Sequence, residues 1–113
     1  MHNRLGHSYK EVYYQRAFES ELKRLNIEYK KEVKFYLKFK NEVIGKHYAD
    51  FLVENEIVVE FKTVPYIKDS DKNQLLSYLK SMQKRLGLIV NFRSDKVGIK
   101  RIVLPDKYLL ESD

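Results

Sequence analysis

The chain contains no cysteine, and only two prolines and four glycines occur among its 113 residues. Without cysteine, disulfide bonds, thiolate metal sites and a cysteine nucleophile are excluded. The four glycines do not form a Gly-rich phosphate-binding loop, and no serine stands in a nucleophile elbow. The sequence therefore offers neither a P-loop nor a serine-based hydrolytic site.

Long hydrophobic runs are also missing, because purely apolar stretches such as residues 88–90 are only a few residues long. A membrane-spanning helix needs about 20 apolar residues, so no membrane span is expected. The first ten residues, MHNRLGHSYK, are polar and lack the apolar core of a secretion signal. These features predict a cytoplasmic protein, and the length fits one domain over residues 1–113.

Positive charge is in excess. Lys and Arg number 22 against 16 for Asp and Glu, which gives a net charge of +6. This sign favours a polyanionic partner, and nucleic acid is the commonest one. The alternative is a basic charge that serves solubility and binds nothing.

The N-terminal part has the pattern of a helix from Ser8 to about Asn26. Ser8 and Glu11 have the spacing of a capping box at its start. Apolar residues spaced by three or four form one stripe along it, comprising Tyr14, Phe18, Leu22 and Leu25.

Three strands with short connections follow. Val33 to Phe39 alternates apolar residues with a basic face, which includes Lys34, Lys38 and Lys40. A turn at residues 41–42 leads into a second strand that ends at Val53, and a turn at residues 54–56 leads into a third at 57–62. Such short connections predict an antiparallel meander.

The C-terminal half adds a helix and two strands. Asp69, Ser70 or Asp71 can cap a helix to about Arg85. Its expected inward residues are Leu75, Leu79, Met82 and Leu86. Residues 86–92 and 98–104 read as strands. The order αβββαββ predicts an α/β fold with a mixed sheet flanked by helices.

Two carboxylates and a lysine interrupt the apolar second and third strands. Glu60 and Lys62 project from one face of their strand, with Phe61 on the other. On the preceding strand, Asp50 shares a face with Tyr48 and Leu52 by the same alternation, and it lies across the hairpin from residues 60–62. Two carboxylates so close repel each other, and a hard divalent cation such as Mg²⁺ relieves this repulsion. A cross-strand ion pair between Asp50, Glu60 and Lys62 is the structural alternative.

An Asp followed after nine residues by Glu-X-Lys on a β-hairpin resembles the signature of the PD-(D/E)XK nuclease superfamily. Ala49 replaces the proline that often precedes the aspartate. The resemblance implies a restriction-endonuclease-like core. It also implies that Asp50, Glu60 and the backbone carbonyl of Phe61 hold Mg²⁺, with Mn²⁺ as its substitute. Lys62 would then stabilise the pentavalent phosphorus and orient the attacking water.

Further motifs resemble the GxxExxY family within this superfamily. Gln74 and Tyr78 form a Q-X-X-X-Y motif, and Glu11 and Tyr14 match the E-X-X-Y half of the family motif after the Leu5–Gly6 pair. The segments LGLIVNF and IKRIVL also look like that family, whereas Ser8 replaces the glycine of the motif. The resemblance implies that Gln74 lies near the scissile phosphate and that Glu11 positions a water or a second metal.

The predicted function is a Mg²⁺-dependent deoxyribonuclease acting in DNA repair, recombination, or a mobile-element or defence context. The predicted substrate-binding residues are Tyr78, Tyr14, Lys34, Lys38, Lys40, Lys100 and Arg101. A homodimer is compatible with one active site cutting one strand. The alternatives are a nucleic-acid-binding module that does not cut and a protein-interaction subunit on the same fold. The three histidines, His2, His7 and His47, are interpreted as surface residues.

Overall fold

The computed structural model describes residues 2–93 and 96–109. Within these residues the elements follow in the order α1 (His2–Arg24), β1 (Tyr29–Phe39), β2 (Glu42–Val53), β3 (Ile57–Lys62), α2 (Asp69–Met82), β4 (Leu86–Arg93), β5 (Lys96–Val103) and the short 3-10 helix η1 (Asp106–Tyr108). The α/β class and the order αβββαββ expected from the sequence are confirmed.

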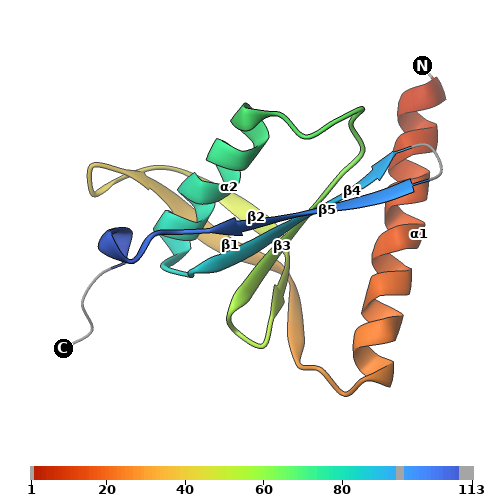
Figure 1. Ribbon diagram of the computed structural model, residues 1–113, viewed down its shortest axis with the longest axis horizontal. Coiled ribbons are helices and arrows are strands. Elements are labelled where there is room, and N and C mark those ends of the chain that lie inside the picture. Colours follow the sequence, from red (N-terminus) through yellow and green to blue (C-terminus); the bar gives the residue numbers. More distant parts are fainter. Residues whose placement is uncertain (1, 94–95, 110–113) are drawn as a thin grey trace.

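The strands form one mixed sheet in the spatial order β1-β2-β3-β4-β5, as Figure 1 shows. β1, β2 and β3 pair antiparallel, which confirms the meander. β3 and β4 are parallel, and β4 and β5 are antiparallel. A parallel pair requires a crossover between its strands, and α2 supplies it. This architecture is that of the restriction-endonuclease-like core.

The two helices pack on opposite faces of the sheet. Successive residues of β3 point to opposite sides: Val58 belongs to a core with Leu75 and Leu79 of α2, whereas Val59 belongs to a second core with Leu22 of α1. Aromatic residues fill much of this second core. Phe18 of α1 lies edge-on to the rings of Phe51 and Phe61, at centroid distances of 5.0 and 5.5 Å. The residues of β3 therefore have core on both sides.

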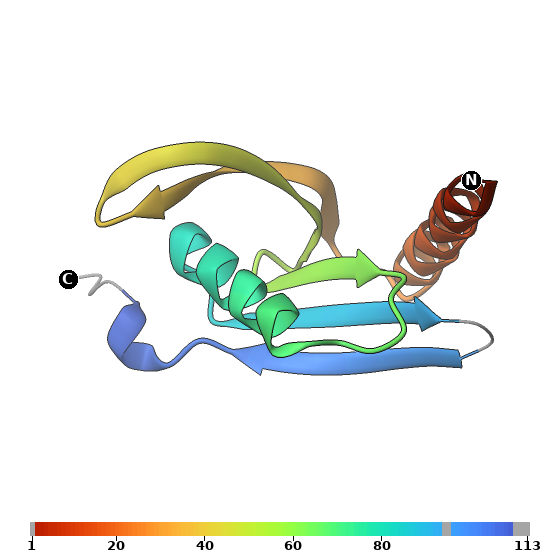
Figure 2. The same ribbon diagram turned by 90° about the horizontal axis from the view of Figure 1, so that it is seen from above.

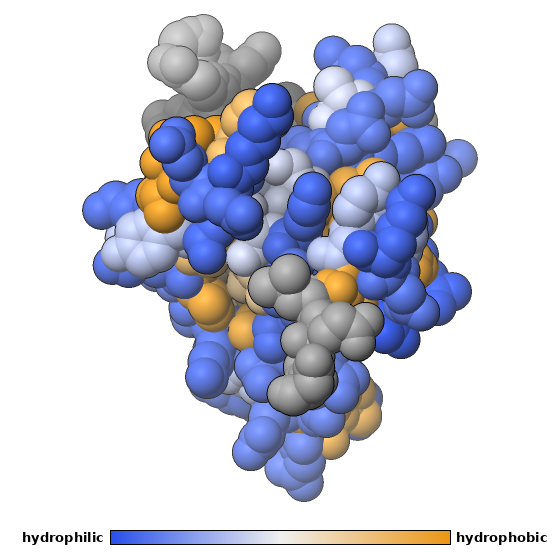
Figure 3. All heavy atoms as spheres, turned by 90° about the vertical axis from the view of Figure 1, so that its left-hand side faces the viewer, coloured by the Kyte–Doolittle hydropathy of each residue, from blue (hydrophilic) through white to orange (hydrophobic). Residues whose placement is uncertain are grey.

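The hairpin of β1 and β2 extends beyond the other strands and curves over α2, as Figure 2 shows. Its pairing with β3 stops at Phe51 and Val59. Within the hairpin, the residues on either side of Glu32 and Asp50 are paired, but these two are not paired with each other. Glu32 has a positive φ of 52°. Figure 3 views the end of the molecule that carries the hairpin tip, where hydrophobic atoms lie in separate patches among hydrophilic ones.

This irregularity changes which residues of β2 share a face. Ala49 and Leu52 both pack in the core under α2, whereas Phe51 packs in the core under α1. Strict alternation would have placed Ala49 and Phe51 on one side. The strict alternation expected around Asp50 therefore does not hold, because the strand is distorted at this residue.

Several expected boundaries are also wrong. α1 begins at His2, so Ser8 lies inside the helix, where a serine cannot act as an N-cap. Leu25 follows the helix and is 51% exposed. α2 ends at Met82 because Gln83 adopts a left-handed conformation, which places Leu86 on β4 rather than on the helix. Phe39, at the hairpin end, is 61% exposed.

Candidate active site

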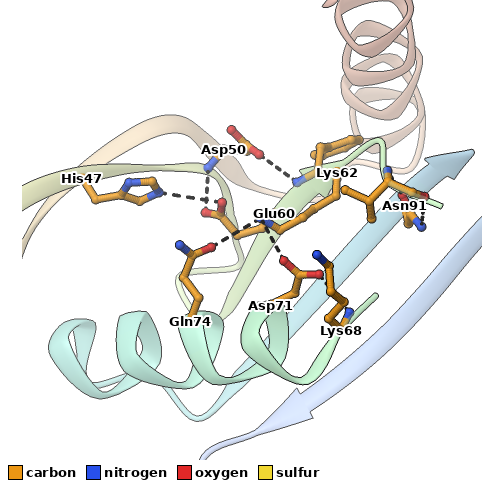
Figure 4. A network of polar contacts seen from close by, with 10 residues as sticks. His47, Asp50, Glu60, Lys62, Lys68, Asp71, Gln74 and Asn91 are labelled. Carbon is orange, nitrogen blue, oxygen red and sulfur yellow. Dashed lines mark hydrogen bonds and ion pairs between the residues drawn. The ribbon is translucent and has the colours of Figure 1, made fainter. Parts of the chain in front are cut away.

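The site lies where β2 and β3 separate, and two carboxylates fill the opening. The backbone N–H of Phe61 donates to Asp50 Oδ2 at 2.8 Å, and the backbone N–H of Asp50 donates to Glu60 Oε2 at 3.4 Å. Figure 4 shows both contacts between the strands. Each carboxylate thus takes the place of a carbonyl that would continue the ladder. The end of regular pairing is what brings Asp50 and Glu60 together.

Both carboxyl groups have raised pKa values. Burial, followed by the charge of Asp50, raises the pKa of Glu60 to about 8. Burial also raises the pKa of Asp50, although the hydrogen bond from the backbone of Phe61 acts in the opposite direction. Glu11 of α1 is close enough for its charge to contribute to the raised pKa of Glu60. The site therefore concentrates negative charge in a partly desolvated place, which favours a bound cation.

The donor set fits a hard cation. Among the described residues, no three His, Cys, Asp or Glu side chains come together as a metal cage. Mg²⁺ does not need one, because it keeps several waters and is commonly held by one or two carboxylates together with substrate phosphates. Asp50 and Glu60 supply two such carboxylates, and their raised pKa values indicate that a positive charge between them would be stabilising.

Lys62 stands beside the carboxylates and is held from α2. Its Nζ donates to Gln74 Oε1 at 3.3 Å and lies 3.9 Å from Asp71 Oδ1. Asp71 in turn accepts a hydrogen bond at 2.9 Å from the backbone N–H of Lys68, at the start of α2. The first two turns of α2 therefore fix the position of the Lys62 ammonium group.

His47 belongs to the site, which sequence reasoning missed. Its ring stacks on Tyr78 of α2 with centroids 4.3 Å apart, and its Nε2 lies 3.8 Å from Glu60 Oε1. This nitrogen is buried, and no hydrogen-bond partner for it occurs among the described residues. Burial is also the main cause that lowers the pKa of His47. The interpretation as a surface histidine is wrong for its Nε2 end. Strict alternation separates residues 47 and 50, and only the distortion at Asp50 brings them together.

The structure packs both predicted substrate-binding tyrosines into the fold. Tyr78 is 7% exposed and lies between His47 and the edge of Phe35. Tyr14 of α1 stacks on Phe92 of β4 at 4.0 Å. Tyr78 therefore contacts the site through His47.

The predicted basic residues are dispersed over the sheet. Lys34 lies on the face of β1 opposite to Phe35, which packs under α2. Lys38 and Lys40 lie at or near the turn of the hairpin. On β5, Lys100 and Arg101 are neighbours and so point to opposite faces. The structure thus brings together Asp50, Glu60, Lys62 and Gln74, with Glu11 nearby, and leaves these lysines and Arg101 outside that group.

The structure is thus an α/β domain in which Asp50, Glu60 and Lys62 lie close together where strands β2 and β3 separate. The sequence model of the PD-(D/E)XK nuclease superfamily matches residues 1–102. The chain belongs to that superfamily.

The crystal structure of SSO0001 is similar with a TM-score of 0.62 and 27% sequence identity, over 83% of this chain. The matched part is 50% of that protein, so this chain spans about half its length. None of the curated proteins matches this chain. Within the described residues, no helix is long and apolar enough to cross a membrane.

Proposed function

We propose that this protein is a Mg²⁺-dependent deoxyribonuclease, with Mn²⁺ as a substitute, that hydrolyses phosphodiester bonds and leaves a 5′ phosphate. The observation that carries the proposal is the pair of carboxylates formed by half-buried Asp50 and buried Glu60, beside the ammonium group of Lys62. The pair has raised pKa values, and the chain belongs to a nuclease superfamily. Burial outweighs the lowering effect of the Lys62 charge on both pKa values.

Asp50, Glu60 and the backbone carbonyl of Phe61 would hold the metal ion. The ion, when bound, would neutralise phosphate charge and lower the pKa of a bound water. Lys62 would stabilise the negative charge that develops on the pentavalent phosphorus and orient the attacking water. Gln74 accepts a hydrogen bond from Lys62, so its role would be to aim this ammonium group at the phosphate.

We further place the chain in the GxxExxY family of the superfamily. Glu11 and Tyr14 provide part of its motif, and Gln74 and Tyr78 provide the Q-X-X-X-Y pattern. The electrostatic influence of Glu11 on Glu60 supports a role for Glu11 in positioning a water or a second metal ion. Because Tyr78 packs on His47, its role would be to hold the histidine in place rather than to contact substrate.

The test is cleavage of labelled single-stranded, duplex and branched DNA in Mg²⁺, Mn²⁺ or EDTA. Wild type would be compared with Asp50→Ala, Lys62→Ala and, as a matched lysine control, Lys107→Ala on η1. We expect metal-dependent cutting, and a loss of about 10²–10³-fold in rate for Lys62→Ala, the scale reported for removing one group that stabilises a transition-state charge. Lys107→Ala should cut like wild type.

Inert wild-type protein that remains folded, on all substrates and with both metals, would overturn the proposal. Equal cutting by wild type and Asp50→Ala would overturn it too, since a contaminating nuclease would then explain the activity. DNA binding without turnover would instead favour a module that binds and does not cut.

A further inference from the structure

A pocket lies one strand away from the candidate active site. This pocket of about 430 Å³ lies between the β3–α2 loop and β5, and it is lined by Tyr66, Ile67, Asn91, Lys96, Gly98 and Lys100 together with Val97 and Ile99. Figure 2 shows this loop passing over β4 toward β5. The pocket lies outside the group formed by Asp50, Glu60 and Lys62.

Asn91 connects the pocket to the active site. It is 2% exposed, and its side-chain amide both donates to the backbone carbonyl of Val64 and accepts from the backbone N–H of Val64, each at 3.0 Å. In the sheet, Asn91 pairs with Lys62 on one side and with Gly98 on the other. A buried residue thus fixes the loop that carries Tyr66 and spaces the pocket one strand away from Lys62.

The lining of the pocket suits an anion with a planar group. Two of its residues, Lys96 and Lys100, are cationic, and none of the lining residues among those that the structure describes is acidic. Tyr66 is 64% exposed although it sits on a clamped loop, which leaves its ring available for stacking. The volume falls within the range of roughly 300–1,000 Å³ of pockets that bind small molecules or parts of them. A nucleotide combines the planar base and the phosphate that this lining would recognise.

We propose that this pocket binds one unpaired nucleotide of the substrate strand, with its base stacked on Tyr66 and the adjoining phosphates near Lys96 and Lys100. The inference rests on the proposed nuclease function, because it identifies the strand that reaches Lys62 as the strand that fills the pocket. A base within a duplex is stacked on its neighbours and cannot present its face to Tyr66. The preferred substrate is therefore single-stranded next to the cleaved bond, as in a free strand, an overhang or a flap.

Binding in EDTA tests the pocket without cleavage. Fluorescence anisotropy would compare a labelled single-stranded oligonucleotide of DNA, the same sequence in RNA, and a blunt duplex of equal length, all at one low salt concentration. The variants are Tyr66→Ala, Tyr66→Phe and Gly98→Leu. The control is Tyr36→Ala, which removes an exposed tyrosine from β1, where it lies outside the pocket lining.

We expect Tyr66→Ala to weaken binding of the single strand by roughly tenfold, the scale of losing one base–aromatic stack. Tyr66→Phe keeps the ring and should bind like wild type, as should Tyr36→Ala. Gly98→Leu should also weaken single-strand binding, because it fills the pocket. A Cβ at Gly98 would meet no atom within 4 Å, so this variant should fold normally, which thermal unfolding would check.

Unchanged single-strand affinity in both Tyr66→Ala and Gly98→Leu would overturn the proposal. Equal losses for single strand and duplex would also overturn it, since they would indicate a general polyanion surface. If wild type cuts DNA while the pocket variants bind normally, the pocket fails and the nuclease stands. If wild type binds single strands through Tyr66 yet never cuts, the nuclease fails and the pocket stands.

Discussion

The Nε2 of His47 lies 3.8 Å from Oε1 of Glu60, and this buried nitrogen has no hydrogen-bond partner in the part of the chain that the structure describes. A buried nitrogen left unsatisfied costs about 1–3 kcal/mol, and a small movement of the carboxylate would satisfy it. The tautomer with hydrogen on Nε2 could then donate to Glu60 and fix the orientation of this carboxylate. Stacking on Tyr78 at 4.3 Å holds the imidazole in place for that contact.

His47→Ala should therefore weaken Mn²⁺ binding by about tenfold or more, the scale found for residues that orient metal ligands. Isothermal titration calorimetry of metal-free protein would measure the affinity. Tyr78→Phe preserves the stacked ring and serves as the control with wild-type affinity. An unchanged Mn²⁺ affinity in His47→Ala would show that the histidine does not position Glu60.

Gln74→Leu should lower the cleavage rate by about tenfold, because Lys62 loses the side-chain oxygen that holds its ammonium group. Gln74→Glu keeps an oxygen acceptor and should restore much of the rate. Single-turnover kinetics would measure both variants, with Mn²⁺ affinity as the second readout. A role in aiming Lys62 predicts that the affinity stays unchanged, and a weakened affinity in Gln74→Leu would count against it.

The contribution of Glu60 to the stability of the metal-free protein should fall as pH rises. The pKa of Glu60 is raised by burial from 4.5 to about 8 in the folded state, so the folded protein binds more protons than the unfolded chain between these values. The contribution of Glu60 to the free energy of unfolding is therefore largest below about pH 4.5, and this contribution decreases up to about pH 8. At 1.36 kcal/mol per pKa unit, the loss is on the order of a few kcal/mol.

Urea unfolding in EDTA at pH 5, 6.5 and 8 would measure this dependence. Glu60→Gln should abolish most of it, and saturating Mg²⁺ should flatten it in wild type by stabilising the ionised carboxylate. A stability that rises over this pH range, equally in wild type and Glu60→Gln, would contradict the raised pKa.

Gly87→Ala should destabilise the fold by about 1–3 kcal/mol, the usual cost of overpacking a core. A Cβ at Gly87 would lie 2.9 Å from Leu75 Cδ2, beneath α2. Gly45→Ala is the matched control, because a Cβ there would meet no atom within 4 Å. Urea unfolding would compare the two variants. Equal stabilities would show that α2 can move away from β4 without cost.

The sequence alone determined the order of elements and the opposition of Asp50 to residues 60–62. Apolar alternation marks each strand locally, and short turns leave an antiparallel meander as the only way to pair the first three strands. The hairpin register then places Asp50 opposite Glu60. Helix boundaries were less well predicted. The capping-box spacing of Ser8 and Glu11 indicated a helix start at Ser8, whereas α1 begins at His2 and continues through this local signal.

Only the tertiary structure decided what surrounds these carboxylates. The distortion at Glu32 and Asp50 interrupts the regular alternation of side chains, so that alternation gave no signal that His47 faces Glu60. The packing of Tyr78 on that histidine and the clamping of Val64 by Asn91 join residues far apart in the sequence. Such contacts follow from packing between elements, which local periodicity does not encode.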